Sequence, residues 1–242
     1  MSRRPASPPP PAPPAQSVSM ASRPPRRRAG PTPPRAPDVV LPDLDVADRS
    51  VLLSGRWDCA LVDGAELAQA RLEGLVVLES SVEDAVLDGA LLAGARVTGS
   101  GWERVSAVAA DAARTQWADV EVTDARLSAL RLVGARLDRV VLRRCRLDGA
   151  VLRDAQLTDV LLDGCDLRGA DLTGAQLRRV SFAGSDLTDA DLAGARCDDV
   201  DLRGATLEDL RGADGLRGCT VDAVQLVALA PSLAAHVGLL TL

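Results

Sequence analysis

The side chains that could support catalysis are few and widely spaced. The only histidine, His236, lies near the C-terminus and has no nucleophile at a recognisable spacing. General-base and nucleophilic catalysis both require such a pair within hydrogen-bonding reach. Glycine-rich phosphate-binding motifs such as GxGxxG are absent as well. We therefore expect His236 to be a surface or capping residue, and we expect a protein that is not an enzyme and has no cofactor.

The five cysteines show no CxxC spacing, which argues against a zinc or disulfide framework and favours reduced thiols. Cys145 and Cys165 are twenty residues apart and occupy equivalent places in a repeat described below. One interpretation makes them a metal-binding or redox pair. The favoured interpretation is that they are small side chains packed in an interior, so we expect no metal site.

Charge and composition set further limits. The formal net charge is −6, the chain contains no Tyr, Lys, Asn or Ile, and this bias is typical of a GC-rich, actinobacterial genome. No apolar run approaches the roughly 18 residues that a membrane span requires, and the N-terminus lacks the apolar core of a signal peptide. We expect a cytoplasmic protein with no membrane contact.

The first 37 residues differ sharply from the rest. They hold 13 of the 15 prolines and seven arginines but no acidic residue, with Met20 as an alternative start. Such a segment cannot bury enough apolar surface to offset its ordering entropy. We expect a disordered, partly polyproline II arm over residues 1–37. The sequence RPPRRR could contact an acidic surface or nucleic acid, although a solvated tail is the favoured interpretation.

Beyond the arm, apolar residues recur at every fifth position, as in ADLTG AQLRR VSFAG SDLTD for residues 170–189. Stepping from Leu52 to Leu207 gives thirty-two such positions, called i below, which hold every Trp and the only Phe. Helix and strand periods are about 3.6 and 2.0 residues, so this pattern indicates a repeated corner. We expect the side chains at i to face a common interior.

The other places of the repeat support this interpretation. Position i − 2 holds mostly Ala, and position i + 2 holds mostly Gly and Asp, which tolerate positive φ. Valine recurs at i − 2 every twenty residues from Val120 to Val200. Twenty residues are four repeats, so we expect four faces per coil.

The segments ADLTG, SDLTD, ADLAG and CDLRG resemble the A(D/N)Lxx signature of the pentapeptide-repeat family over about residues 50–209. This resemblance implies an all-β solenoid, a right-handed quadrilateral β-helix of about eight coils over residues 38–209. At about 4.8 Å per layer the rod would be roughly 38 Å long. The repeats GRWDC, VSAVA and TQWAD depart from the signature, so we expect a less regular first half.

Residues 210–242 abandon the period of five. Apolar residues at helix-like spacing predict helical structure there, with Pro231 ending one helix or beginning another. This tail resembles the C-terminal helical cap of the family, which covers the last coil and often contributes a homodimer contact. A cap is favoured over a dedicated partner-binding helix.

Charge on the predicted coils is uneven. Nine of the ten net negative charges fall on two adjacent faces, which predicts an acidic interaction face and disfavours direct nucleic-acid binding by the β-helix. Its candidate residues are Glu66, Glu83, Asp84, Glu121, Asp124, Asp186, Asp189, Glu208 and Asp209.

The favoured function is a non-catalytic scaffold that mediates protein–protein interaction with an unknown partner. Exposed apolar positions such as Val141 and Leu161 would mark a contact. The alternative is a DNA-mimicking binder of DNA gyrase or topoisomerase, because the family includes quinolone-resistance proteins of this kind. Duplex DNA carries roughly 22 charges over a rod of this length, against nine here.

Overall fold

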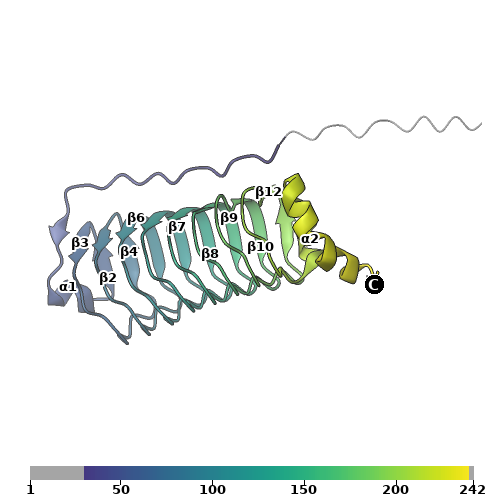
Figure 1. Ribbon diagram of the computed structural model, residues 1–242. Coiled ribbons are helices and arrows are strands. Elements are labelled where there is room, and N and C mark those ends of the chain that lie inside the picture. The colour runs from purple at the N-terminus through teal and green to yellow at the C-terminus, as the bar shows by residue number, and fades with distance from the viewer. Residues whose placement is uncertain (1–29, 240–242) are drawn as a thin grey trace, which may run out of the picture.

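The computed structural model describes residues 30–239 and shows a right-handed parallel β-helix of about eight coils with a short C-terminal helix (Figure 1). The expected fold is confirmed. Its elements are β1 (Asp45–Val46), α1 (Arg49–Leu53), β2 (Arg56–Asp58), β3 (Ala60–Asp63), β4 (Val76–Leu78), β5 (Ser81–Glu83), β6 (Arg96–Glu103), β7 (Gln116–Thr123), β8 (Arg136–Arg143), β9 (Gln156–Asp163), β10 (Gln176–Ser181), β11 (Arg196–Asp198), β12 (Val200–Asp201), the 3₁₀ helix η1 (Ala213–Leu216), β13 (Cys219–Thr220) and α2 (Ala223–His236).

Strand register fixes the size of a coil. Gln116 of β7 pairs with Arg96 of β6 and with Arg136 of β8, always in parallel. The isolated bridges on the remaining faces, such as Asp166 with Asp186, have the same offset of twenty residues. The predicted four repeats per coil are therefore correct. Pairing runs without a break along β6 to β9 and is interrupted toward both ends of the rod, rather than in the first half alone.

The corners lie at i + 2. From Cys59 to Asp209 every residue at this position has φ between 45 and 75°, whether or not it is glycine. On two faces the N–H of residue i + 3 donates to the carbonyl of residue i, as from Ala170 to Leu167 at 3.0 Å. A positive φ at the third residue of a four-residue turn is the type II geometry. Asp and Arg accept it here alongside Gly because the paired coils above and below fix the backbone.

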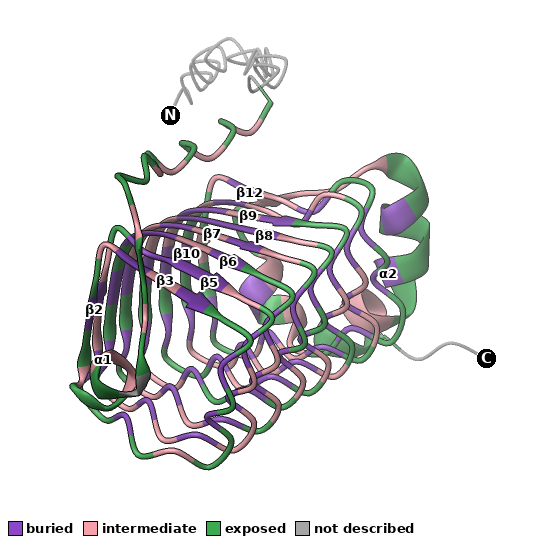
Figure 2. Ribbon diagram, turned by 90° about the vertical axis from the view of Figure 1, so that its left-hand side faces the viewer, coloured by how far each residue is buried: buried purple, intermediate pink, exposed green. Residues whose placement is uncertain are grey.

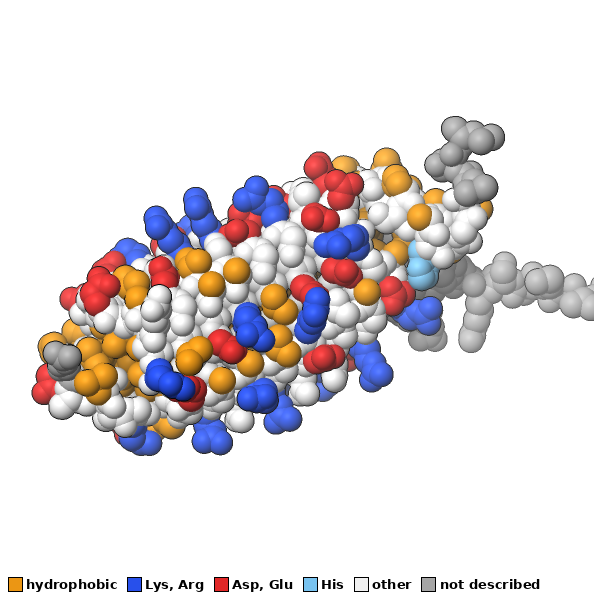
Figure 3. Space-filling model, turned by 90° about the horizontal axis from the view of Figure 1, so that it is seen from below, with side chains coloured by type: hydrophobic (Ala, Val, Ile, Leu, Met, Phe, Trp, Pro, Cys, Tyr) orange, Lys and Arg blue, Asp and Glu red, His pale blue; other side chains and the backbone are white. Residues whose placement is uncertain are grey.

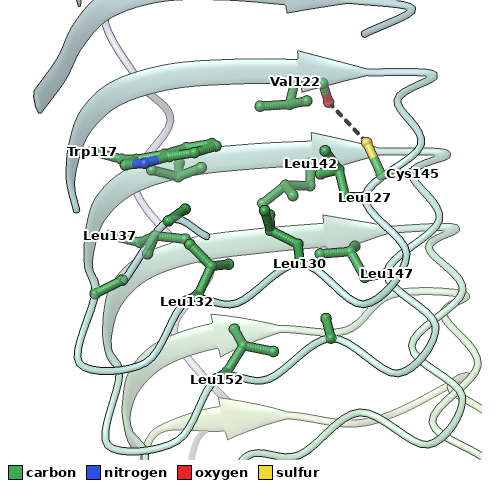
Figure 4. Packing of buried hydrophobic residues seen from close by; sticks show 14 of the residues in the cluster. Trp117, Val122, Leu127, Leu130, Leu132, Leu137, Leu142, Cys145, Leu147 and Leu152 are labelled. Carbon is green, nitrogen blue, oxygen red and sulfur yellow. Dashed lines mark hydrogen bonds between the residues drawn. The ribbon is translucent and has the colours of Figure 1, made fainter. Parts of the chain in front are cut away.

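The interior is a continuous apolar column. Thirty of the thirty-two i side chains are buried, and the exceptions, Leu52 and Cys197, are partly buried. Figure 2 shows buried and exposed residues alternating along the strands, and Figure 4 shows leucines from successive coils stacked in the interior. The rings of Trp102 and Trp117 stack there with centroids 6.1 Å apart. The inward assignment of position i is confirmed.

The N-terminal segment returns along the rod before the coils begin. Residues 30–44 follow the outside of the β-helix toward its N-terminal end (Figure 1). There β1 pairs with β3, and Val51 and Leu52 of α1 pack against the core. The predicted disordered arm lies mostly outside the described residues. Its described part, residues 30–37, has no regular secondary structure but makes hydrogen bonds to the rod that are analysed below.

The C-terminal segment covers the last coil. Strand β13 pairs with β12, and a Cβ at Gly212 or Gly218 would lie 2.1 or 2.2 Å from the backbone of the coil beneath. Helix α2 continues through Pro231, contrary to the expected break. Proline removes one N–H from the helix, and the carbonyl it would have satisfied belongs to Val227, an exposed residue where water can replace it. No helix within residues 30–239 is long and apolar enough to cross a membrane.

Candidate interaction surfaces

Most of the predicted acidic residues have an arginine beside them. Six of the nine lie within 4.0 Å of a guanidinium nitrogen. The pairs are Glu83 and Asp84 with Arg104, Glu121 with Arg143, Asp124 with Arg144, Asp186 with Arg168, and Asp189 with Arg211. The two faces keep their net negative charge, but most of the acidic side chains on them are paired with an arginine.

The best-formed pairs join equivalent corners of adjacent coils. The Nε and Nη2 atoms of Arg104 donate to the two carboxylate oxygens of Asp84, each at 2.8 Å, and Arg144 binds Asp124 in the same way. Hydrogen bonds from these arginines lower the pKa of Asp84 and of Asp124. Such bidentate pairing fixes both the charge and the orientation of the carboxylate.

Few predicted acidic residues remain without a cation. Among the described residues, Glu66, Glu208 and Asp209 have no arginine within 4.0 Å. Figure 3 shows acidic and basic side chains interspersed over one side of the rod. The structure thus places the predicted residues on the outside but intersperses them with arginines. The signal for this was in the sequence, where Asp84, Arg104, Asp124 and Arg144 alternate at intervals of twenty.

The predicted apolar contact is partly wrong. Val141 is only 3% exposed and Leu161 is half-buried, so neither offers an open apolar surface. Both occupy outward positions of the repeat, where the sequence pattern predicts exposure. The period of five places a side chain outside the coil but does not report what lies against that face.

Exposed large apolar side chains lie instead on the N-terminal segment, at Val40, Leu41, Val46 and Leu53, and on and just after α2. The first two turns of α2 expose Val224, Leu226 and Val227, at 80, 53 and 74%. The opposite side of the helix holds Gln225 and Leu229, which are buried. The helix contains no Asp, Glu or Arg, and its one ionisable residue is His236 at the last position. Apolar surface on a helix without flanking charges is typical of a protein–protein contact.

The tail also contains the residues closest to a catalytic arrangement. Ser232, His236 and Asp214 line an open depression of about 320 Å³ between η1 and α2. No hydrogen bond is found between these three side chains within the described part of the chain. Residues 30–239 also contain no group of three or more His, Cys, Asp or Glu side chains placed to hold a metal ion.

Cys145 and Cys165 are buried neighbours in adjacent coils, as expected. The Cys145 thiol donates to the carbonyl of Arg143 at 3.3 Å, and the Cys165 thiol to that of Leu142 at 3.4 Å. The neighbouring Cys145 thiol and burial raise the pKa of Cys165, which therefore remains a neutral thiol. These contacts favour packing over the metal-binding or redox interpretation.

The repeats, corners and register described above define a parallel β-solenoid that displays side chains on flat faces. Residues 115–192 match the model of the pentapeptide repeat region, so the repeat in this part of the chain is the pentapeptide repeat. The comparisons indicate no catalytic family. A search of curated proteins finds no match.

Several solved structures are similar to parts of this chain. HetL, a pentapeptide repeat protein involved in heterocyst differentiation regulation in the cyanobacterium Nostoc sp. strain PCC 7120, is 21% identical, with 69% of this chain and 89% of HetL covered and a TM-score of 0.48. QnrB1, a plasmid-mediated fluoroquinolone resistance protein, is 19% identical, with 77 and 98% covered and a TM-score of 0.38. A pentapeptide repeat protein of the Arabidopsis thaliana thylakoid lumen is 17% identical, with 74 and 77% covered and a TM-score of 0.27.

Proposed function

We propose that this protein is a non-catalytic scaffold whose contact surface for other proteins is the exposed side of α2. The observation that carries the proposal is the apolar surface of Val224, Leu226 and Val227 on a helix fixed to the end of a rigid rod. The core of a protein interface is typically depleted in charged residues, and this helix has none on that side.

The occupant that fits this surface best is a second copy of the chain. The surface is apolar, and a twofold contact between two α2 helices would cover the same residues on both copies. Such a homodimer would hold two rods end to end and present their faces at a fixed separation. Any further protein partner would bind those faces.

Sedimentation velocity on the full chain tests the contact. Val227→Glu places a charge at the centre of the proposed interface, and Val46→Glu makes the same change at a site of nearly equal exposure at the other end of the rod. We expect a dimer in the wild type and in Val46→Glu, and a monomer in Val227→Glu. A wild type that stays monomeric at all concentrations, or a dimer that Val227→Glu leaves intact, rejects the contact.

DNA mimicry is the weaker candidate because arginines neutralise most of the acidic residues it would need. A mimic must present an uninterrupted row of negative charge, about one per 1.7 Å of its length. We expect no inhibition of gyrase supercoiling by micromolar protein. If inhibition occurs and is lost when Glu66, Glu208 and Asp209 are replaced by Gln, Gln and Asn, the acidic faces are the binding site and the α2 scaffold is not the function.

A further inference from the structure

The N-terminal segment is hydrogen-bonded to one corner of the β-helix at regular intervals. The backbone N–H of Thr32 donates to Asp199 Oδ1 at 3.0 Å, and that of Arg35 donates to Asp159 Oδ1 at 3.1 Å. The N–H of Asp38 continues the series to Asp119 Oδ1 at 3.2 Å. The donors are three residues apart, and the acceptors are forty residues apart, which is two coils.

These two spacings agree in length. A polyproline II helix has three residues per turn and rises about 3.1 Å per residue, so three residues advance about 9.3 Å. Neighbouring strands lie about 4.8 Å apart, so two coils advance about 9.6 Å. One turn of polyproline II therefore spans two coils, and a segment of this conformation can repeat the same contact along the rod. In Figure 1 the segment follows the β-helix over several coils.

The sequence of the segment suits this geometry. Residues 31–38 read PTPPRAPD, so four of the eight positions have φ fixed near −65°. Thr32, Pro33 and Ala36 also precede a proline, which favours an extended conformation at those residues. Four N–H groups remain, and three of them donate to the aspartates. The fourth, on Ala36, has no hydrogen-bond acceptor within the described chain.

The aspartates that accept these N–H groups belong to a row of charged residues at one corner of the β-helix, called the corner row. Asp119, Arg139, Asp159, Arg179 and Asp199 alternate in charge at the same corner of successive coils. The Nε and Nη2 atoms of Arg139 donate to the carboxylate of Asp119 at 2.6 and 2.7 Å. The same two atoms of Arg179 donate to the carboxylate of Asp159 at 2.7 and 2.6 Å. Asp159 is only 3% exposed. Arginines thus hold the carboxylates of Asp119 and Asp159 in place, and each Oδ1, which already accepts Nε, has a second lone pair for a further N–H.

We propose that the corner row Asp119, Asp159 and Asp199 is a binding track for polyproline II segments that present an N–H at every third residue, and that residues 31–38 occupy it as a built-in ligand. The backbone N–H groups set the register, and the prolines keep the segment extended before it docks. The track recognises mainly conformation and donor spacing, because the donors that set the register are the backbone N–H groups of Thr32, Arg35 and Asp38.

Amide hydrogen exchange on the full chain tests the register. We expect the N–H groups of Thr32, Arg35 and Asp38 to exchange about ten to a hundred times more slowly than that of Ala36. Arg35→Pro removes the central donor but keeps the segment extended. Ala36→Pro makes the same change at the neighbouring N–H, and Arg35→Ala keeps the donor while removing the charge.

Each variant has a defined outcome. Arg35→Pro should raise exchange at Thr32 and Asp38 about tenfold, whereas Ala36→Pro and Arg35→Ala should leave both protected, with the β-helix amides unchanged in all three. A peptide of residues 30–40 added to Arg35→Pro should bind with a dissociation constant on the order of millimolar and shift the signals of Asp119, Asp159 and Asp199. Three results would each overturn the proposal. Arg35→Pro and Ala36→Pro could have equal effects, or the N–H of Thr32 could exchange as fast as that of Ala36 in the wild type. The third is that the peptide shifts no signal at several millimolar.

Discussion

The amide of Gln225 fastens α2 to the last coil, and replacing it tests the capping role directly. Its Nε2 atom donates to the backbone carbonyls of Leu202 and Ala205, the second at 2.7 Å, and the side chain is 6% exposed. Its Oε1 atom accepts the N–H of Asp222 at 2.9 Å and completes the capping box of α2. The variant Gln225→Met keeps the length of the side chain and removes all three hydrogen bonds.

The size of the effect follows from these contacts. A buried carbonyl left without a donor costs about 1–3 kcal/mol, and loss of half a capping box costs about 0.5–1 kcal/mol. In Gln225→Met the Leu202 carbonyl keeps the N–H of Ala205, so the Ala205 carbonyl is the one left without a donor. Water reaches it if α2 lifts, and this opening exposes Leu229, whose burial is worth about 2 kcal/mol. We therefore expect the free energy of opening of the cap to fall by about 2–4 kcal/mol. The central coils should be little affected, because each coil contacts only its neighbours.

Hydrogen exchange reports the two regions separately. The N–H of Leu202, which donates to Thr220 at 2.9 Å, and that of Leu226, which donates to Asp222, belong to the cap. Their exchange should accelerate by about thirtyfold to a thousandfold in Gln225→Met, while amides of β8 stay unchanged. Leu53→Met introduces the same residue at an exposed site away from α2 and should leave the exchange of both amides unchanged. If both variants behave alike, or if β8 loses protection equally, the amide of Gln225 does not hold the cap.

The remaining predictions concern the core, the cap edge and pH. Leu172→Arg places an unpaired charge in the interior and should lower the free energy of unfolding by more than about 4 kcal/mol. Leu161→Arg on the outer face should lower it only slightly, and equal melting temperatures of the two variants would refute the inward assignment of position i. Truncation after Gly218 removes β13 and α2 and should produce open-ended association by light scattering instead of a defined dimer; a monodisperse product would remove the capping role. Hydrogen bonds from Arg139, Arg179 and Thr32 lower the pKa of Asp119, Asp159 and Asp199, respectively. The stability that these three aspartates contribute is therefore present above about pH 4 and is lost as the pH falls through the lowered pKa values. Amide shifts of residues 32–38 that move at pH 5 to 6 would contradict this.

The regular part of the fold could be predicted from sequence because one local rule repeats without interruption. In each repeat the large apolar residue at i marks the side that faces the interior. The small residue at i − 2 allows close packing, and the turn-forming residue at i + 2 marks the corner. The interval between valines specifies the coil, and the register of β6 with β7 agrees with it. The same local rule says nothing about contacts between distant parts of the chain.

The interaction surfaces were harder to predict for this reason. The acidic faces were identified by their net charge, which counts arginines but does not show that Arg104 and Arg144 pair directly with Asp84 and Asp124 one coil away. The Pro-rich composition of residues 1–37 led to the prediction of a disordered arm because such a segment lacks a core, but a segment without a core can still bind a matching surface, as Thr32 and Arg35 do. The alternation of Asp and Arg from Asp119 to Asp199 was the available signal for that surface.

The offset of twenty residues between paired strands limits how such a chain can change in length during evolution. Loss of twenty residues shortens the rod by about 4.8 Å and leaves every downstream face where it was. Loss of five residues rotates everything downstream by a quarter turn and moves the later aspartates to another corner. Because residues 31–38 contact alternate coils, an internal loss of twenty residues between Asp119 and Asp159 would set an arginine against a donor, while a loss of forty would keep acid against donor. The β-helix itself can therefore lose or gain one coil at a time. The contacts of residues 31–38 are kept only when coils are lost or gained in pairs.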